Sequence, residues 1–213
     1  MTGKSLLLIG GGGHCRSCID VIESHGEFTV RGIIDKPEKV GGEVLGYPVL
    51  GTDEEIKQYT GEHCFFLVTL GQIESPKRRR ELFEMVKHLG GSFAVIVSPR
   101  AYVSRHASLG EGTIVMHNAL VNAGASVGKN CIVNTGAIVE HDAVIGDHCH
   151  IAPGAIVNGG VIVGKNTFIG SGAVSRHEIV IAENSFIRAQ SMVKSGTGDG
   201  AQGTGRQVFP QGS

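Results

Sequence analysis

From residue 103 onward, the chain places a large aliphatic residue at every sixth position, and this period constrains the fold more than any other feature. Of the sixteen such positions from Val103 to Val193, fifteen carry Val, Leu or Ile, and the exception is Ser175. Most hexads carry a small residue four positions later, and only Val161 and Ile179 are larger. A period of six fits neither a 3.6-residue helix nor simple strand alternation. Each hexad is therefore predicted to be a short strand and a turn of a solenoid, with the aliphatic residue inside.

This pattern resembles the hexapeptide-repeat acyltransferases. The resemblance implies a left-handed triangular parallel β-helix with three hexads, or eighteen residues, in each coil. Handedness rests on the resemblance alone, because most parallel crossovers are right-handed. One hexad cannot bury its apolar face by itself, so stability is expected to come mainly from stacked coils about 4.8 Å apart. Cys131 and Cys149 lie one coil apart at the small position and are predicted to fill the core.

Chain length and the change of residue pattern near Pro99 indicate two domains and a tail. The repeats begin after Pro99, so we expect a nucleotide-sugar-binding domain over 1–99, a β-helix over 100–194 and a flexible Gly-rich tail over 195–213. A net charge of −1 gives no electrostatic case for nucleic acid or an anionic membrane surface. The apolar run over 6–9 is too short for a signal peptide or a membrane span, which favours a cytoplasmic protein without membrane insertion.

The five cysteines show no disulfide-scaffold spacing. Cys15 and Cys18 form a lone C-x-x-C, and no second pair completes a zinc site, so no metal is expected.

The first hundred residues alternate between predicted strands and helices, which indicates a small parallel α/β, Rossmann-like domain. We expect strands over 4–9, 28–35, 64–70 and 93–97, and helices over 14–25, 53–59 and 76–89. The basic run over 77–80 falls in the last helix. It is predicted mainly as a solvated helix face, with a phosphate contact as the alternative.

A glycine-rich turn joins the first predicted strand to the first helix. Glycines there let backbone N–H groups approach a phosphate at the positive end of the helix, so the turn predicts a nucleotide site. The G-x-G-x-x-G fingerprint is incomplete because Cys15 replaces its third glycine, which argues against an NAD-linked redox role. A purely structural turn is the alternative. The candidate substrate-binding residues are Gly10, Gly11, Gly12, Gly13, His14 and Asp35.

Three histidines gather within ten residues of the solenoid, in Glu140-His141-Asp142 and His148-Cys149-His150. By register, His141 lies at a corner and His150 on the outer side of its hexad. They are nine residues apart, half of an eighteen-residue coil, so they face away from each other within one subunit. If both are catalytic, the site lies between chains, and a three-sided prism is expected to close as a cyclic trimer.

The stretch from Asn134 to Ala155, together with the opening strand and its G-G-G-G-H turn, resembles the PglD/NeuD-like sugar acetyltransferases, which modify UDP-4-amino sugars and sialic acids. The resemblance implies an acetyl-CoA-dependent N-acetyltransferase acting on the 4-amino group of a UDP-linked amino sugar. It assigns His141 as general base and Asp142 as its supporting acid. It places His150 near the thioester and acetyl-CoA contacts at Asn134, Gly159 and Ser171.

Histidine chemistry is consistent with these roles. An imidazole that titrates near pH 6.5 can accept the proton of an attacking amine, and a neighbouring carboxylate raises its basicity. The oxyanion at the thioester would need a donor such as a backbone N–H at Gly159 or the ring of His150. An acetyl-cysteine route is disfavoured because Cys131 and Cys149 are predicted to point inward.

Other functions stay open at this point. The closest variant is O-acetylation of a sialic-acid-type sugar. A metal hydratase like the γ-type carbonic anhydrases could recruit His117, His141, His148 and His150, and a non-catalytic scaffold is a third class. The tail from Ser195 departs from the family pattern, which puts contacts to the adenine end of the coenzyme in doubt. Relatives also occur fused behind a membrane-bound sugar-phosphate transferase, so the chain could be one domain of such a fusion.

Overall fold

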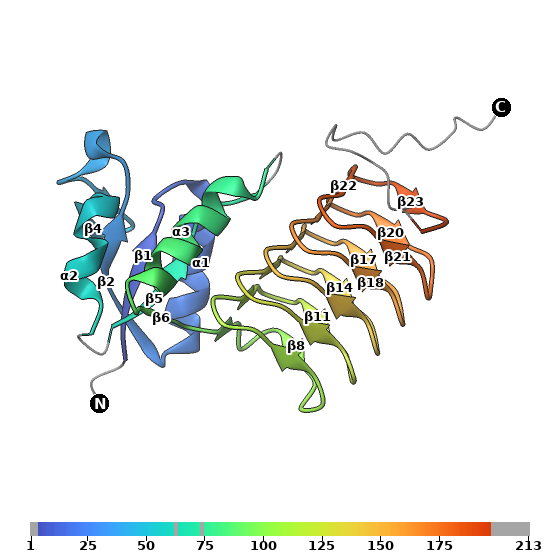
Figure 1. Ribbon diagram of the computed structural model, residues 1–213. Helices are drawn as coiled ribbons and strands as arrows, with labels where there is room; N and C mark the ends of the chain where they lie inside the picture. The colour runs from blue at the N-terminus through green and yellow to red at the C-terminus, as the bar shows by residue number, and fades with distance from the viewer. Residues whose placement is uncertain (1–3, 62–63, 73–74, 197–213) are drawn as a thin grey trace.

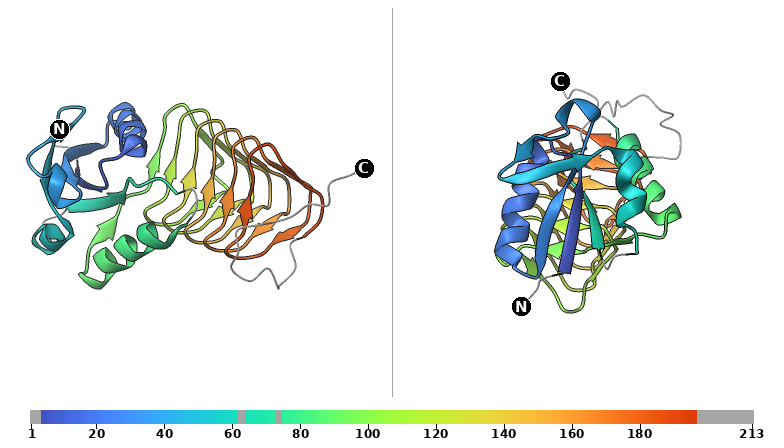
Figure 2. Two further views of the ribbon diagram at one scale, coloured as in Figure 1. Left: turned by 90° about the horizontal axis from the view of Figure 1, so that it is seen from above. Right: turned by 90° about the vertical axis from the view of Figure 1, so that its left-hand side faces the viewer.

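The computed structural model describes residues 4–61, 64–72 and 75–196. An α/β domain lies at one end, and a three-sided coil of short strands extends away from it (Figure 1). Viewed along the coil axis, the sheet of the α/β domain stands in front of the triangular solenoid (Figure 2). In the described residues, no helix is both long enough and apolar enough to cross a membrane.

The α/β domain is built around β1 (Lys4–Ile9), which pairs in parallel with β2 (Phe28–Ile34) and β5 (Cys64–Val68). Residues 6–9 of β1 are all buried, as expected for a parallel strand that is covered on both faces. Helices α1 (Gly13–His25) and α3 (Lys77–His88) lie on opposite sides of the sheet (Figure 2). The short 3-10 turn η2 (Asp53–Glu55) and α2 (Ile56–Tyr59) form the predicted helix over 53–59.

Two features of this sheet differ from the prediction. An antiparallel hairpin of β3 (Glu43–Val44) and β4 (Tyr47–Gly51) extends the edge beyond β2, giving the order β3-β4-β2-β1-β5-β6. The single strand expected over 93–97 is two strands in different sheets. β6 (Ser92–Phe93) pairs with β5, whereas β7 (Ile96–Val97) pairs with β10 of the solenoid, so the solenoid begins at Ile96.

Every solenoid strand pairs in parallel with the strand eighteen residues away, which forms three faces. The first face contains β7, β10 (Ile114–Val115), β13 (Ile132–Val133), β16 (His150–Ile151), β19 (Phe168–Ile169) and β22 (Phe186–Ile187). The second contains β8 (Tyr102–Val103), β11 (Leu120–Val121), β14 (Ile138–Val139), β17 (Ile156–Val157), β20 (Val174–Ser175) and β23 (Met192–Val193). The third contains β9 (Ser108–Leu109), β12 (Ser126–Val127), β15 (Val144–Ile145), β18 (Ile162–Val163) and β21 (Val180–Ile181).

The periodic aliphatic residues form the interior of the solenoid, as predicted. The core cluster includes residues such as Val139 and Ile151, together with the two stacked cysteines Cys131 and Cys149. Ser175 does not interrupt the register, because β20 pairs with both β17 and β23. The prediction of inward-pointing cysteines is therefore confirmed: both thiols are fully buried.

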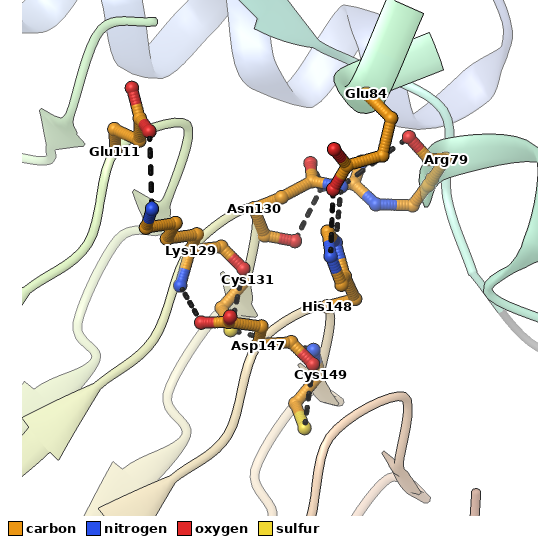
Figure 3. Close-up of polar contacts among 9 residues, drawn as sticks. All are labelled: Arg79, Glu84, Glu111, Lys129, Asn130, Cys131, Asp147, His148 and Cys149. Carbon is orange, nitrogen blue, oxygen red and sulfur yellow. Dashed lines mark hydrogen bonds and ion pairs between the residues drawn. The ribbon is translucent and has the colours of Figure 1, made fainter. Parts of the chain in front are cut away.

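The corner after the third face carries alternating charges on successive coils. Glu111 forms an ion pair with Lys129 at 3.5 Å, and the backbone N–H of Lys129 donates a hydrogen bond to the carboxylate of Asp147 (Figure 3). On the coil after Asp147, Lys165 pairs with Glu183 of the next coil at 3.2 Å. Glycine precedes most of these charges because the coils are close: a Cβ on Gly128 would lie 2.7 Å from the backbone nitrogen of Asp147.

Arg79 ties the α/β domain to this corner. Its guanidinium donates to the carbonyls of Val68 and Leu70 and to the side-chain oxygen of Asn130, 2.8 Å away. Figure 3 shows it reaching from α3 to the solenoid, beside His148. The prediction of a solvated helix face was wrong for this residue, since Arg79 is only 2% exposed. Burial lowers its pKa to about 10, so it remains charged at neutral pH.

Replacing Arg79 by methionine is expected to lower the free energy of unfolding by about 3 kcal/mol, because buried carbonyls and an amide lose their donor. Urea denaturation would measure the loss. Arg80→Met is the matched control: its side chain is exposed on the next position of the helix, and a change within about 0.5 kcal/mol is expected. Equal stability of the two variants would contradict the anchoring role.

Candidate active site

His141 lies at the corner that follows β14, and its ring is paired with the next residue. Its Nδ1 is 2.9 Å from Oδ2 of Asp142, whose backbone adopts a left-handed conformation with φ of 59°. The side chain of Glu140 accepts the backbone N–H of His141 and the amide of Asn122. The hydrogen bond that the carboxylate of Asp142 accepts raises the pKa of His141 above its usual value. This corner thus presents an exposed imidazole of increased basicity.

Gly159 lies one coil beyond His141 and leaves room for its ring. A Cβ at position 159 would lie 2.6 Å from Nε2 of His141. The neighbouring Gly160 donates its backbone N–H to the carbonyl of His141 at 3.0 Å. Any side chain at position 159 would therefore displace the imidazole. The close approach of the His141 ring explains why a glycine occupies this position.

His150 lies on the outer surface of the first face, but the α/β domain covers it. Its Nδ1 is 2.6 Å from the carbonyl oxygen of Gln72, and its Nε2 is 3.0 Å from Nδ2 of Asn134. Since a carbonyl only accepts, Nδ1 carries the proton and Nε2 accepts from Asn134. The expectation of an outward position is correct, but His150 is 6% exposed because the segment before α3 packs on it.

Burial lowers the pKa of His150 to about 4, although its hydrogen bond to Gln72 opposes the shift. The ring is therefore neutral at pH 7, and its one N–H is already engaged. In this arrangement, His150 has no free N–H for an oxyanion.

His14 lies next to this histidine. The two ring centroids are 6.4 Å apart, and Nε2 of His14 is buried with no hydrogen-bond partner among the described residues. Burial, together with the nearby charge of Arg79, lowers the pKa of His14 to about 3. His14, Gln72, Asn134 and His150 form what we call the interdomain cluster, a set of neutral polar groups where the two domains meet.

A cavity of about 330 Å³ opens at the carboxyl ends of the central strands of the α/β domain. Asp35 lines it and accepts the backbone N–H of Gly11 at 2.7 Å and the ammonium of Lys39 at 2.8 Å. These donors help to hold the pKa of the Asp35 carboxyl below its usual value, although burial opposes the shift. The cavity lining comprises Ile9, Gly10, Ile34, Asp35, Lys36, Pro37, Thr52, Asp53, Glu54, Leu70, Arg78 and Leu82.

The structure thus sorts the predicted residues into three groups. His141, Asp142 and Gly159 share one corner. Asn134, His150 and His14 meet in the interdomain cluster, and Ser171 lies at the corner after the first face, two coils beyond Thr135, the residue that follows Asn134. Gly10 and Asp35 line the cavity, whereas Gly11 and Gly12 lie in the turn that leads from it to α1 and Gly13 is the first residue of that helix.

Sequence reasoning missed several residues of these groups. Gln72 contacts His150 through its backbone carbonyl, which any residue type would supply. The residue type at position 72 therefore gives no signal of this contact. Lys39 lies four residues after Asp35, a spacing that could have suggested the ion pair.

The four histidines considered for a metal do not gather in one chain. Among the described residues, no three His, Cys, Asp or Glu side chains converge as a metal site would require. His117 already contacts Ser98 and Asp20, and His148 contacts Asn130.

Comparisons with known proteins add the following. Residues 5–86 match the PglD N-terminal domain family, and residues 124–159 and 142–174 match the bacterial transferase hexapeptide family. The acetyltransferase domain of PglB from Neisseria gonorrhoeae FA1090, solved also in complex with acetyl coenzyme A, is 30% identical with a TM-score of 0.86. The alignment of this chain with the domain solved without ligand covers 93% of this chain and 95% of the PglB domain. A search of the curated proteins returned no significant match.

A second solved structure is PerB from Caulobacter crescentus in complex with CoA and GDP-perosamine. It is 32% identical with a TM-score of 0.83, covering 90% of this chain and 89% of that one. WeeI from Acinetobacter baumannii AYE, at 20% identity and a TM-score of 0.69, shares the fold. These likenesses confirm the predicted architecture of a Rossmann-like domain followed by a left-handed parallel β-helix.

Proposed function

The chain belongs to the PglD/NeuD-like hexapeptide-repeat sugar acetyltransferases, and from that premise we propose that it transfers the acetyl group of acetyl-CoA to the 4-amino group of a UDP-linked amino sugar. The observation that carries the proposal is the likeness to the acetyltransferase domain of PglB and to PerB over at least nine-tenths of the chain. One was solved with acetyl coenzyme A and the other with CoA and an amino-sugar nucleotide.

In the proposed reaction, His141 is the general base. As the sugar nitrogen attacks the thioester carbonyl, its proton moves to Nε2, the ring nitrogen that does not face Asp142. The carbon–sulfur bond then breaks, and the resulting imidazolium returns the proton to the departing CoA thiolate. Asp142 holds the ring in the tautomer that leaves Nε2 free to accept.

Because His150 has no free N–H, we assign the oxyanion to a backbone N–H such as that of Gly159. His150 and Asn134 are proposed to contact the thioester end of acetyl-CoA, with Ser171 further along the coenzyme. In this assignment His150, Asn134 and Ser171 all lie on or beside the first face of the prism.

The nucleotide is proposed to occupy the cavity beside Asp35 and the glycine turn. Backbone N–H groups at the start of α1, which has no acidic residue in its first turn, suit the diphosphate. GDP is the alternative to UDP, because PerB was solved with a GDP-linked sugar. O-acetylation of a sialic-acid-type sugar is not favoured by any contact in this cavity.

A homotrimer with sites between subunits is proposed for two reasons. His141 and His150 lie on different parts of the same prism, so one chain alone does not bring them together. The third face also exposes an unpartnered apolar row, Val144, Ile162 and Val180, whose exposed fractions are 41%, 47% and 53%. Such a row is typical of a surface that a second subunit covers.

Acetyl-CoA turnover against UDP-linked and GDP-linked 4-amino sugars and free sialic acids would test the function directly. Release of CoA with a UDP-linked amine is the expected result, and turnover only with GDP-linked amines would correct the nucleotide. Turnover only with sialic acids would replace N-acetylation by O-acetylation. No CoA release with any acceptor would reject the proposed function.

The pH dependence of kcat/KM is expected to report His141. A general base must be deprotonated, so activity rises with pH through a pKa that Asp142 raises above about 6.5. Asp142→Asn removes the raising charge, and the acidic limb of the profile is expected to move to lower pH. A limb in the same place in both proteins would show that this pair does not set the profile.

A further inference from the structure

The corner that carries His141 is packed against the same corner of the preceding coil, which we call the support corner. Each of its three residues lies eighteen positions before one residue of Glu140-His141-Asp142; they are Asn122, Ala123 and Gly124. Nδ2 of Asn122 donates to Oε2 of Glu140 at 2.8 Å, and the backbone N–H of Asp142 donates to the carbonyl of Ala123 at 3.1 Å. The support corner therefore contacts the catalytic corner through both side chain and backbone.

Asn122 holds the side chain of Glu140 in one orientation. The side-chain oxygen of Asn122 accepts the backbone N–H of Ala123 at 2.8 Å, which leaves its Nδ2 to face Glu140. The same oxygen of Glu140 also accepts the backbone N–H of His141 at 3.2 Å. The Glu140 carboxylate is thus fixed between the half-buried amide of Asn122 and the backbone of the catalytic corner.

Gly124 determines where the carboxylate of Asp142 can lie. Its backbone is left-handed, with φ of 75°, and a Cβ at this position would overlap Oδ1 of Asp142 and lie 3.3 Å from its Cγ. The other carboxylate oxygen, Oδ2, is the one that faces Nδ1 of His141. The side chains of His141 and Asp142 are 59% and 73% exposed, so solvent surrounds most of the pair. A side chain at position 124 would therefore displace the carboxylate from the imidazole.

We propose that Gly124 and Asn122 are positioning residues for the catalytic corner: Gly124 sets the direction of the Asp142 carboxylate, and Asn122 holds Glu140. The inference rests on the proposed function in taking His141 as the general base. Each of the two residues acts through a residue on the next coil, without contact with the substrate. Misplacing a catalytic group by about 1 Å is enough to lower turnover by about 10²-fold.

The charged groups beside the ring of His141 give this arrangement a measurable signature. Asp142, through its hydrogen bond, and Glu140 both raise the pKa of His141. The two adjacent corners contribute no charge, since they consist of the segments 122–124, Asn-Ala-Gly, and 158–160, Asn-Gly-Gly. Moving the Asp142 carboxylate away from Nδ1 should therefore lower the pKa of the ring.

Titration of the His141 ring tests the support corner without any turnover. The titration is followed by NMR in the full-length protein, with His141→Ala to assign the signal. Gly124→Ala is expected to move the midpoint to lower pH, in the direction of Asp142→Asn. Gly26→Ala is the matched control, because Gly26 has φ of 76° and no atom except its chain neighbours within 4 Å of its Cβ position. It introduces the same backbone strain and is expected to leave the midpoint unchanged.

Kinetics of acetyl transfer provide the second measurement. Gly124→Ala is expected to lower kcat by roughly 10- to 100-fold with KM unchanged. In the Asp142→Asn background the added loss should be less than about twofold, because Gly124 acts through Asp142. Asn122→Ala changes no left-handed residue and so guards against a folding defect. It is expected to lower kcat by roughly two- to tenfold, the effect of one hydrogen bond.

A His141 midpoint that stays in place in Gly124→Ala, or that moves equally in Gly26→Ala, would overturn the inference. Fully additive losses from Gly124→Ala and Asp142→Asn would also overturn it, and wild-type kcat in Asn122→Ala would reject the part assigned to Asn122. A displaced midpoint in a protein that releases CoA with no acceptor would reject the proposed function and leave the support corner standing.

Discussion

His141→Ala is expected to lower kcat/KM for acetyl transfer by about 10²- to 10⁴-fold, the contribution typical of a positioned general base. The fold should not suffer, because the imidazole is exposed and, among the described residues, its ring hydrogen-bonds only to the adjacent Asp142. The loss should appear in kcat, since proton acceptance contributes to the transition state and little to ground-state binding.

His177→Ala is the matched control for this variant. His177 lies at the same corner two coils further along, at the same turn position, and is also exposed. It has no neighbouring carboxylate hydrogen bond among the described contacts, and near-normal turnover is expected. If His141→Ala retained near-normal turnover, or if both variants lost activity equally, His141 would not be the base.

Co-expression of His141→Ala with His150→Ala is expected to restore activity that neither variant has alone. If each site takes His141 from one subunit and His150 from its neighbour, random mixing leaves both residues intact in about a quarter of the sites of a cyclic trimer. The co-expressed population as a whole should therefore show about a quarter of wild-type kcat/KM per site. The pair tests the arrangement without disturbing the apolar third face.

The control is to mix the two proteins after purification, when subunits have no opportunity to assemble together. This mixture should stay at the level of the separate variants. If co-expressed chains also stayed at that level, the site would lie within one chain. A monomeric mass for the fully active wild-type protein would lead to the same conclusion.

The repeat made the solenoid predictable because almost every hexad repeats the same pattern, an aliphatic residue followed four positions later by a small one. A single residue such as Ser175 cannot outweigh its neighbours, and the strands on both sides keep their register. The corner position of His141 and its partner Asp142 followed from the same counting, since they are adjacent in the sequence.

What the sequence does not reveal depends on contacts between distant segments. The run Lys77–Arg80 looks like a solvated helix face, yet Arg79 alone turns toward Asn130, 51 residues away. The cover over His150 comes from a backbone carbonyl 78 residues earlier. The sequence does not predict the hairpin of β3 and β4 because β3 has only two residues and Pro48, an unfavourable strand residue, lies within β4.

The alternating charges at the corner after the third face restrict how the solenoid can change its length. Exposed ion pairs of this kind contribute little stability, about 0 to 1 kcal/mol each. Their sign, however, alternates from Glu111 through Lys129, Asp147 and Lys165 to Glu183. Deleting one inner eighteen-residue turn, such as the one that carries Asp147, would place two like charges against each other, whereas removing two adjacent inner turns would preserve the alternation. Internal deletions of an even number of coils are therefore favoured over odd ones, by about the energy of one exposed ion pair.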